Sequence, residues 1–217
     1  MNQSRVVITP SARARPWVMA LAALIWITLF LRLGLVVEEL WRAGDPLFWA
    51  LGRFGYFTVL TTLLAALSVT AGLFSRRDAV IGSLASVSFA GLVATSLVMV
   101  ALVYTLVLRA QWDPHGLHKV VDSLLHDVIP LAFLLYWWWL VPKSALRYRM
   151  VLYWLCYPAF YLLVVMVLGL AIGWYPYPFL DVPELGPLRV RFNVVALLGL
   201  FAALGAGLIA VSRRWGR

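Results

Sequence analysis

Two short segments carry the residues that could do chemistry: the threonine-rich stretch Phe54–Thr62, and Trp112–Pro130, which holds all three histidines. A threonine hydroxyl becomes a nucleophile when a base such as histidine removes its proton. Thr58 and His126 each lie about one helical turn into an apolar stretch, so their side chains are expected at similar depth. The pair predicts attack on an ester, with Thr58 as nucleophile and His126 as general base.

The same residues have plainer interpretations. A threonine in a helix commonly bonds the carbonyl four residues back, and Thr61 or Thr62 could take the place of Thr58. Pro130 removes the helical partner of the His126 carbonyl, which predicts an open or kinked backbone where the imidazole projects. Asp127 supplies a carboxylate at the position directly after His126, although neighbouring side chains on a helix point about 100° apart. An interfacial histidine bonded to a loop remains the alternative.

A metal site is a second alternative. The spacing of His115, His118, Asp122 and His126 would form one stripe on a continuous helix, and such ligands suit zinc. Pro114 and Gly116 argue against a helix at the start of this segment. The favoured interpretation is a polar helix or loop with no metal, and no cofactor is predicted.

The composition shows what must position these residues. Of the 217 residues, 64% are apolar and 12% are charged, whereas a soluble domain is roughly half apolar and a quarter charged. Soluble enzymes, disordered regulators and disulfide scaffolds are therefore excluded. We predict an all-α integral membrane protein, one domain over 1–217, with six transmembrane helices. The predicted spans are 17–37, 54–74, 79–108, 123–141, 150–172 and 192–211. The first is expected to be an uncleaved signal anchor, and the third is too long for one straight span.

The formal charge of +9 is distributed as membrane topology requires. No Lys/Arg run exceeds two residues, so nucleic acid is not an expected partner. Eleven of the 18 cations lie at the two termini and in the loops after the second and fourth spans, and six lie in the opposite loops. This excess places both termini in the cytoplasm. Tryptophans at the ends of the spans, including Trp49 and Trp215, are expected to form two aromatic belts.

These residues also carry a family resemblance. The motif Tyr56-Phe-Thr58, His126 ahead of Pro130, and the segment Trp174–Asp181 resemble bacterial six-helix membrane proteins of the Pr6Pr family over nearly the whole chain. More distantly, the sequence resembles the androgen-induced (FAR-17a-type) family of eukaryotic membrane hydrolases, although its His–Pro spacing is one residue shorter. That family cleaves fatty acid esters of hydroxy fatty acids with a threonine and a histidine. The resemblance implies these roles for Thr58 and His126, and a location in the bacterial inner membrane.

The expected site therefore lies at the outer end of the second, fourth and sixth spans. Its partners are membrane lipids or a lipid-like ester. A non-catalytic lipid-binding or transport protein that uses the same pocket is the alternative. The candidate substrate-binding residues are Tyr56, Asp127, Tyr177, Asp181 and Asn193.

The cationic bias generates a topology prediction. Reporter fusions after Arg217 are expected to score as cytoplasmic, and fusions within Asp113–Lys119 as external. A periplasmic carboxyl terminus would contradict the assignment, because the candidate site would then face the cytoplasm.

Overall fold

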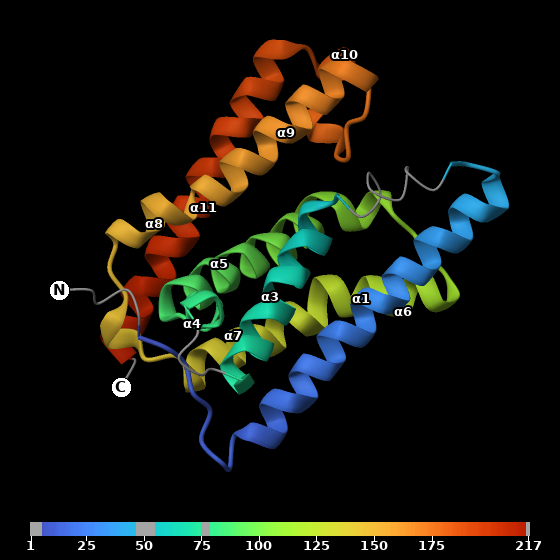
Figure 1. Ribbon diagram of the computed structural model, residues 1–217. Helices are drawn as coiled ribbons and strands as arrows, with labels where there is room; N and C mark the ends of the chain where they lie inside the picture. The colour runs from blue at the N-terminus through green and yellow to red at the C-terminus, as the bar shows by residue number, and fades with distance from the viewer. Residues whose placement is uncertain (1–5, 47–54, 75–78, 216–217) are drawn as a thin grey trace.

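Six helical segments form the bundle, as the distribution of apolar residues predicts (Figure 1). The computed structural model describes residues 6–46, 55–74 and 79–215, and these ranges contain helices and no β-strand. The six segments are long and apolar enough to span a membrane, which confirms the predicted all-α membrane architecture. They are α1 (Arg15–Ala43), α3 (Phe57–Phe74), α5 with its continuation (Val87–Gln111), α6 with α7 (Gly116–Leu140), α8 with α9 (Arg149–Ile172) and α11 (Pro187–Trp215).

The predicted third span, 79–108, is divided in two. A short helix α4 (Ala79–Leu84) ends before Ser86, and α5 (Val87–Val103) begins after it. Ser86 has an extended backbone, and its hydroxyl accepts a hydrogen bond of 3.2 Å from an amide in the first turn of α5. It also forms an isolated antiparallel bridge with Val7. The excess length is therefore absorbed by a helix break, because serine is a strong N-cap residue.

The fourth span begins earlier than the predicted 123–141. Helix α6 (Gly116–Ser123) starts two residues after Pro114 and runs through a π-helical turn, η4 (Leu124–Val128), into α7 (Ile129–Leu140). Gly116 has a φ of +57°, which other residues rarely adopt, so the glycine permits the sharp entry into the helix. As Pro114 and Gly116 predict, the start of this segment is not helical: His115 has an extended backbone, and the helix begins at Gly116.

Two large apolar cores hold the helices together, and a small third cluster of Leu35, Val121 and Leu125 joins α1 to α6 and η4. The larger core is built mainly from α1, α3, α5 and α7, and its largest fully buried side chains include Phe133, Tyr136 and Trp137. The smaller core joins α9 (Cys156–Ile172) to the start of α3 and to the short turn η6 (Pro178–Leu180). In Figure 1, α9 and α11 run beside each other as a pair, and α1 begins at the end of the bundle where α11 finishes. We call the opposite end, where α3 begins, the site end.

The remaining short elements extend or connect these helices. The continuation of α5 consists of η2 (Tyr104–Leu108) and η3 (Arg109–Gln111), and α8 (Arg149–Trp154) precedes α9 in the fifth segment. Two further elements lie in the connections, η5 (Lys143–Ala145) before α8 and α10 (Val182–Leu185) before α11.

Close packing of α5 against α8 depends on one glycine. A Cβ atom added to Gly91 would lie 2.5 Å from Trp154 Cζ2 and 2.6 Å from its Cη2. The indole cannot simply swing away, because its Nε1 donates a 3.1 Å hydrogen bond to the hydroxyl of Ser88. Small residues of this kind let helix backbones approach closely in a membrane.

We therefore expect Gly91→Ala to destabilise the fold by about 1–3 kcal/mol through overpacking. The measurement is thermal unfolding of the purified protein in detergent. Gly34→Ala in α1 is the matched control, because a Cβ at that glycine has no atom within 4 Å. Both substitutions raise helix propensity equally, so equal melting temperatures would contradict the packing argument.

Candidate active site

Thr58 and His126 meet at the site end of the bundle. The Oγ1 atom of Thr58 lies 3.4 Å from Nε2 of His126. Thr58 is the second residue of α3, and the start of that helix is fixed from two directions. The amide of Phe57, the first of the helix, donates to the hydroxyls of Tyr161 and Tyr177, each at 3.1 Å. The distance between Thr58 Oγ1 and His126 Nε2 is long for a hydrogen bond, and hydrogen bonds between catalytic side chains are commonly long when no substrate is bound.

A π turn determines the backbone at His126. Proline lacks an amide hydrogen, so Pro130 cannot bond the carbonyl four residues earlier. In η4 the amide of Ile129 donates instead to the carbonyl of Leu124, five residues back. The sequence predicted an open or kinked helix here, and the structure has this wider turn, in which the carbonyl of Leu124 meets its donor one residue later than in an α-helix. Such single π turns occur frequently at functional sites.

A second π turn faces the first one. In η2 the amide of Arg109 donates to the carbonyl of Tyr104, again five residues back. The Tyr104 ring stacks on the His126 imidazole with 3.7 Å between the ring centroids and 10° between their planes. The imidazole is therefore held face to face against an aromatic ring from the neighbouring span.

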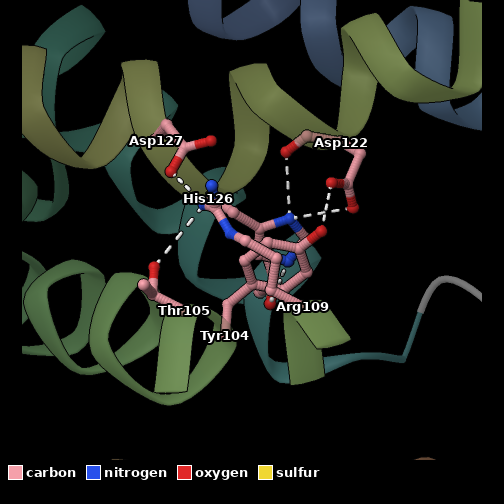
Figure 2. A network of polar contacts seen from close by, with 7 residues as sticks. Tyr104, Thr105, Arg109, Asp122, His126 and Asp127 are labelled. Atoms are coloured by element: carbon pink, nitrogen blue, oxygen red, sulfur yellow. Dashed lines mark hydrogen bonds and ion pairs between the residues drawn. The ribbon is translucent and has the colours of Figure 1, made fainter. Parts of the chain in front are cut away.

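The other nitrogen of the imidazole is held by Asp122, one helical turn earlier (Figure 2). His126 Nδ1 lies 2.9 Å from the backbone carbonyl oxygen of Asp122 and 3.2 Å from its Oδ1. The hydroxyl of Tyr104 donates to the second carboxylate oxygen, Oδ2. The side chains of His126 and Asp122 are only 14% and 15% exposed, so water competes weakly for these contacts.

Thr58 borders two cavities. The larger, of about 350 Å³, is also bordered by His126 and therefore joins the two candidate residues in one space. Its wall mixes apolar side chains with polar ones, which include Arg32, Tyr56, Gln111, His118, Asp122 and Tyr177. The smaller, of about 60 Å³, is almost entirely apolar and reaches toward α9 and α11. A ligand at Thr58 would thus meet a mixed surface on one side and an apolar one on the other.

Tyr177 supplies a neutral hydroxyl beside Thr58. The tyrosine lies in the loop before α11, outside the helical spans, and removal of its hydroxyl from water raises its pKa to about 12. Hydrogen bonds to the Phe57 amide and to the side chains of Thr58 and Tyr161 accompany this burial. Tyr56 packs edge-on against Tyr177, with 5.7 Å between the ring centroids. Tyr56 and Tyr177, the two tyrosines predicted to bind substrate, both line the larger cavity.

Three other predicted binding residues do not line either cavity. Asp127 accepts a hydrogen bond from Arg109 and is 43% exposed, because its side chain points about 100° away from that of His126. Asp181 caps α10 by accepting a 3.2 Å hydrogen bond from the amide of Glu184. Asn193 donates to the carbonyl of Phe179 at 2.8 Å. Each of these side chains has a local structural partner instead of a place in the cavity wall.

The neighbouring threonines cannot replace Thr58 in this arrangement. Thr61 and Thr62 are fully buried. The Thr61 hydroxyl contacts the hydroxyl of Tyr157 at 3.0 Å, and that of Thr62 donates to the carbonyl of Thr58 at 2.8 Å. Only Thr58 among the three reaches His126 and a cavity.

The histidines ahead of α7 do not assemble a metal centre. Among the described residues, no group of three or more His, Cys, Asp or Glu side chains is arranged to hold a metal ion. His118 lies 3.4 Å from Glu39 of α1, and the exposed His115 lies 3.6 Å from Asp113. The i,i+4 spacing places Asp122 and His126 on one helix face, where they form a polar pair.

Comparisons with known proteins add no relative. No family model matches the sequence, and no curated protein or solved structure gives a significant match.

The π turn at Pro130 generates a prediction. In Pro130→Ala the new amide hydrogen can bond the carbonyl of His126, which favours an α-helical ladder in place of η4. Because this closure changes the direction of the imidazole, the contact with Thr58 is expected to be lost. The free energy of unfolding should stay the same or rise, since alanine is about 3 kcal/mol more favourable than proline inside a helix. The measurement is the NMR signal of the His126 ring, combined with thermal unfolding. An unchanged ring signal would show that the proline serves packing alone.

Proposed function

We propose that this protein is a membrane-embedded hydrolase of lipid-like esters, with Thr58 as nucleophile and His126 as general base. The observation that carries the proposal is the 3.4 Å contact between Thr58 Oγ1 and His126 Nε2 on the wall of a cavity. A hydroxyl beside an imidazole, open to a space of ligand size, is the arrangement that activates a weak nucleophile.

The chemistry needs two steps. Thr58 Oγ1 attacks the ester carbonyl while its proton passes to His126 Nε2, and the tetrahedral intermediate expels the alcohol, which takes that proton. Water then attacks the acyl-threonine with His126 again as base, releasing the acid and restoring the hydroxyl. Tyr177 provides a protonated hydroxyl beside Thr58 that can donate to the negative carbonyl oxygen.

Several features favour a lipid-like substrate. The cavity is lined by helices long and apolar enough to span a membrane, which favours an amphiphile of the bilayer as its ligand. Thr58 also borders the smaller apolar cavity, which suits a hydrocarbon arm. The resemblance to the androgen-induced family and the Pr6Pr family points the same way. With the topology predicted from the Lys/Arg distribution, the site faces the outer leaflet of the inner membrane.

The test is covalent labelling of the purified protein with a fluorophosphonate, together with hydrolysis of a medium-chain p-nitrophenyl ester. We expect Thr58→Ala and His126→Ala each to reduce the rate of labelling and the rate of ester hydrolysis by at least about 100-fold. The double variant should be no worse than either single one, because members of one catalytic unit are not additive. Thr58→Ser should retain activity, since it keeps the hydroxyl.

Thr61→Val is the matched control, because it removes a buried hydroxyl one turn away from the cavity. Its labelling is expected to match that of the unmodified protein. Hydrolysis that survives in Thr58→Ala would exclude the nucleophile role. Absence of hydrolysis and labelling in the unmodified protein would favour the non-catalytic lipid-binding or transport alternative.

A further inference from the structure

We infer that Asp122 is the positioning residue for His126, so that Thr58, His126 and Asp122 act as one chain of proton-transfer contacts, with Tyr104 holding the last two in place. The inference rests on the proposed hydrolase function and adds to it two residues from different spans. The i,i+4 spacing places Asp122 on the same helix face as His126, whereas nothing in the sequence points to Tyr104 as a partner.

The first argument concerns the tautomer of the imidazole. To accept the proton of Thr58, Nε2 must carry no hydrogen, so the hydrogen of the neutral ring must lie on Nδ1. Nδ1 faces two acceptors of Asp122, the backbone carbonyl oxygen at 2.9 Å and the carboxylate Oδ1 at 3.2 Å. A carbonyl oxygen cannot donate, and an ionised carboxylate has no hydrogen to give. Asp122 therefore favours the tautomer in which His126 is a base toward Thr58.

The second argument concerns the charge that develops during the reaction. When His126 takes the proton it becomes an imidazolium, and a carboxylate in contact with Nδ1 stabilises that charge. Asp122 is well shielded from water, which strengthens the interaction. Arg109, which lies over the Tyr104 ring, forms its ion pair with Asp127. The described ion pair of Asp122 is the one with His126.

The third argument concerns rigidity. Tyr104 touches both partners, since its ring stacks on the imidazole and its hydroxyl donates to Asp122 Oδ2. One side chain from α5's continuation thereby fixes the plane of the base and the direction of the carboxylate. A base held by packing and by a hydrogen bond keeps the geometry that proton transfer requires.

The neighbouring carboxylate provides a natural comparison. Asp127 adjoins His126 in sequence but binds Arg109 and is three times as exposed as Asp122, at 43% against 15%. Removing either negative charge changes the net charge equally. Only the removal of Asp122 should therefore affect His126.

The experiment compares Asp122→Asn with Asp127→Asn in detergent-solubilised full-length protein, using the same p-nitrophenyl ester. Asp122→Asn is expected to lower kcat by about 10²–10⁴-fold, as loss of the orienting carboxylate does in hydrolases with a comparable arrangement. KM should change less than about twofold, because the carboxylate is engaged with His126 and Tyr104 and acts on the transition state. Asp127→Asn should leave both constants nearly unchanged.

A second readout is independent of turnover. Nitrogen NMR of labelled histidine should show His126 with its hydrogen on Nδ1 in the unmodified protein and a shift toward the other tautomer in Asp122→Asn. Tyr104→Phe keeps the stacked ring and removes only the hydroxyl, so it tests the same arrangement if Asp122→Asn fails to fold. We expect it to lower kcat by about 10–100-fold, the value of one lost hydrogen bond to a charged group.

The outcomes separate the inference from the proposal beneath it. If Thr58→Ala and His126→Ala abolish hydrolysis while Asp122→Asn behaves like Asp127→Asn, the hydrolase stands and the role of Asp122 is overturned. A hydrogen on Nε2 of His126 in the unmodified protein overturns it as well. If Thr58→Ala retains hydrolysis, the proposed function itself fails, whatever Asp122→Asn does.

Discussion

The missing amide hydrogen of Pro130 is the constraint on which the candidate site depends. Within hydrocarbon, a backbone group without a partner costs several kcal/mol, because no water is present to replace it. Directly ahead of Pro130 the chain forms the π turn η4, in which the amide of Ile129 donates to the carbonyl of Leu124. His126 lies within that turn, so the wider backbone determines where the imidazole points. The matching π turn at Tyr104 places an aromatic ring against it.

The first turn of α3 links the site to the rest of the bundle. Its leading amide, that of Phe57, is bonded by Tyr161 of α9 and by Tyr177 of the loop before α11. The position of Thr58 therefore depends on spans that are more than 100 residues away in sequence. This connection also ties the smaller apolar core to the larger one at the site end, since Phe57 belongs to the smaller core.

Several hydroxyl groups in the apolar spans form hydrogen bonds to the backbone of their own helix. Thr28, Thr62, Thr95 and Ser96 each donate to the carbonyl four residues back, at 2.8–2.9 Å. This arrangement removes the cost of an unpaired hydroxyl. Thr58 differs because its hydroxyl contacts an imidazole and borders two cavities. That contrast, more than the presence of threonine in the motif, distinguishes it as a candidate nucleophile.

The sequence by itself determined the number and class of the helices and the depth at which polar residues gather. Hydropathy is a property of each local stretch, and a membrane-spanning stretch has few ways to satisfy its backbone other than as a helix. The same local reasoning placed Thr58 and His126 at one level and marked Pro130 as the point where the helix must adjust. It left Thr61 and Thr62 as substitutes. It named Asp127 as a binding residue and grouped Asp122 with the histidines as a possible metal ligand.

Only the tertiary structure decided among those residues. The rotation of α3 buries Thr61 and Thr62 and turns Thr58 toward the histidine. The rotation of α6 and η4 directs Asp122 to the imidazole and Asp127 to Arg109. Tyr104 could not be assigned a partner in advance, because it comes from another span and its contact depends on how two π turns pack. Depth along a helix follows from counting residues, whereas the direction of a side chain around the helix depends on neighbours that sequence spacing does not specify.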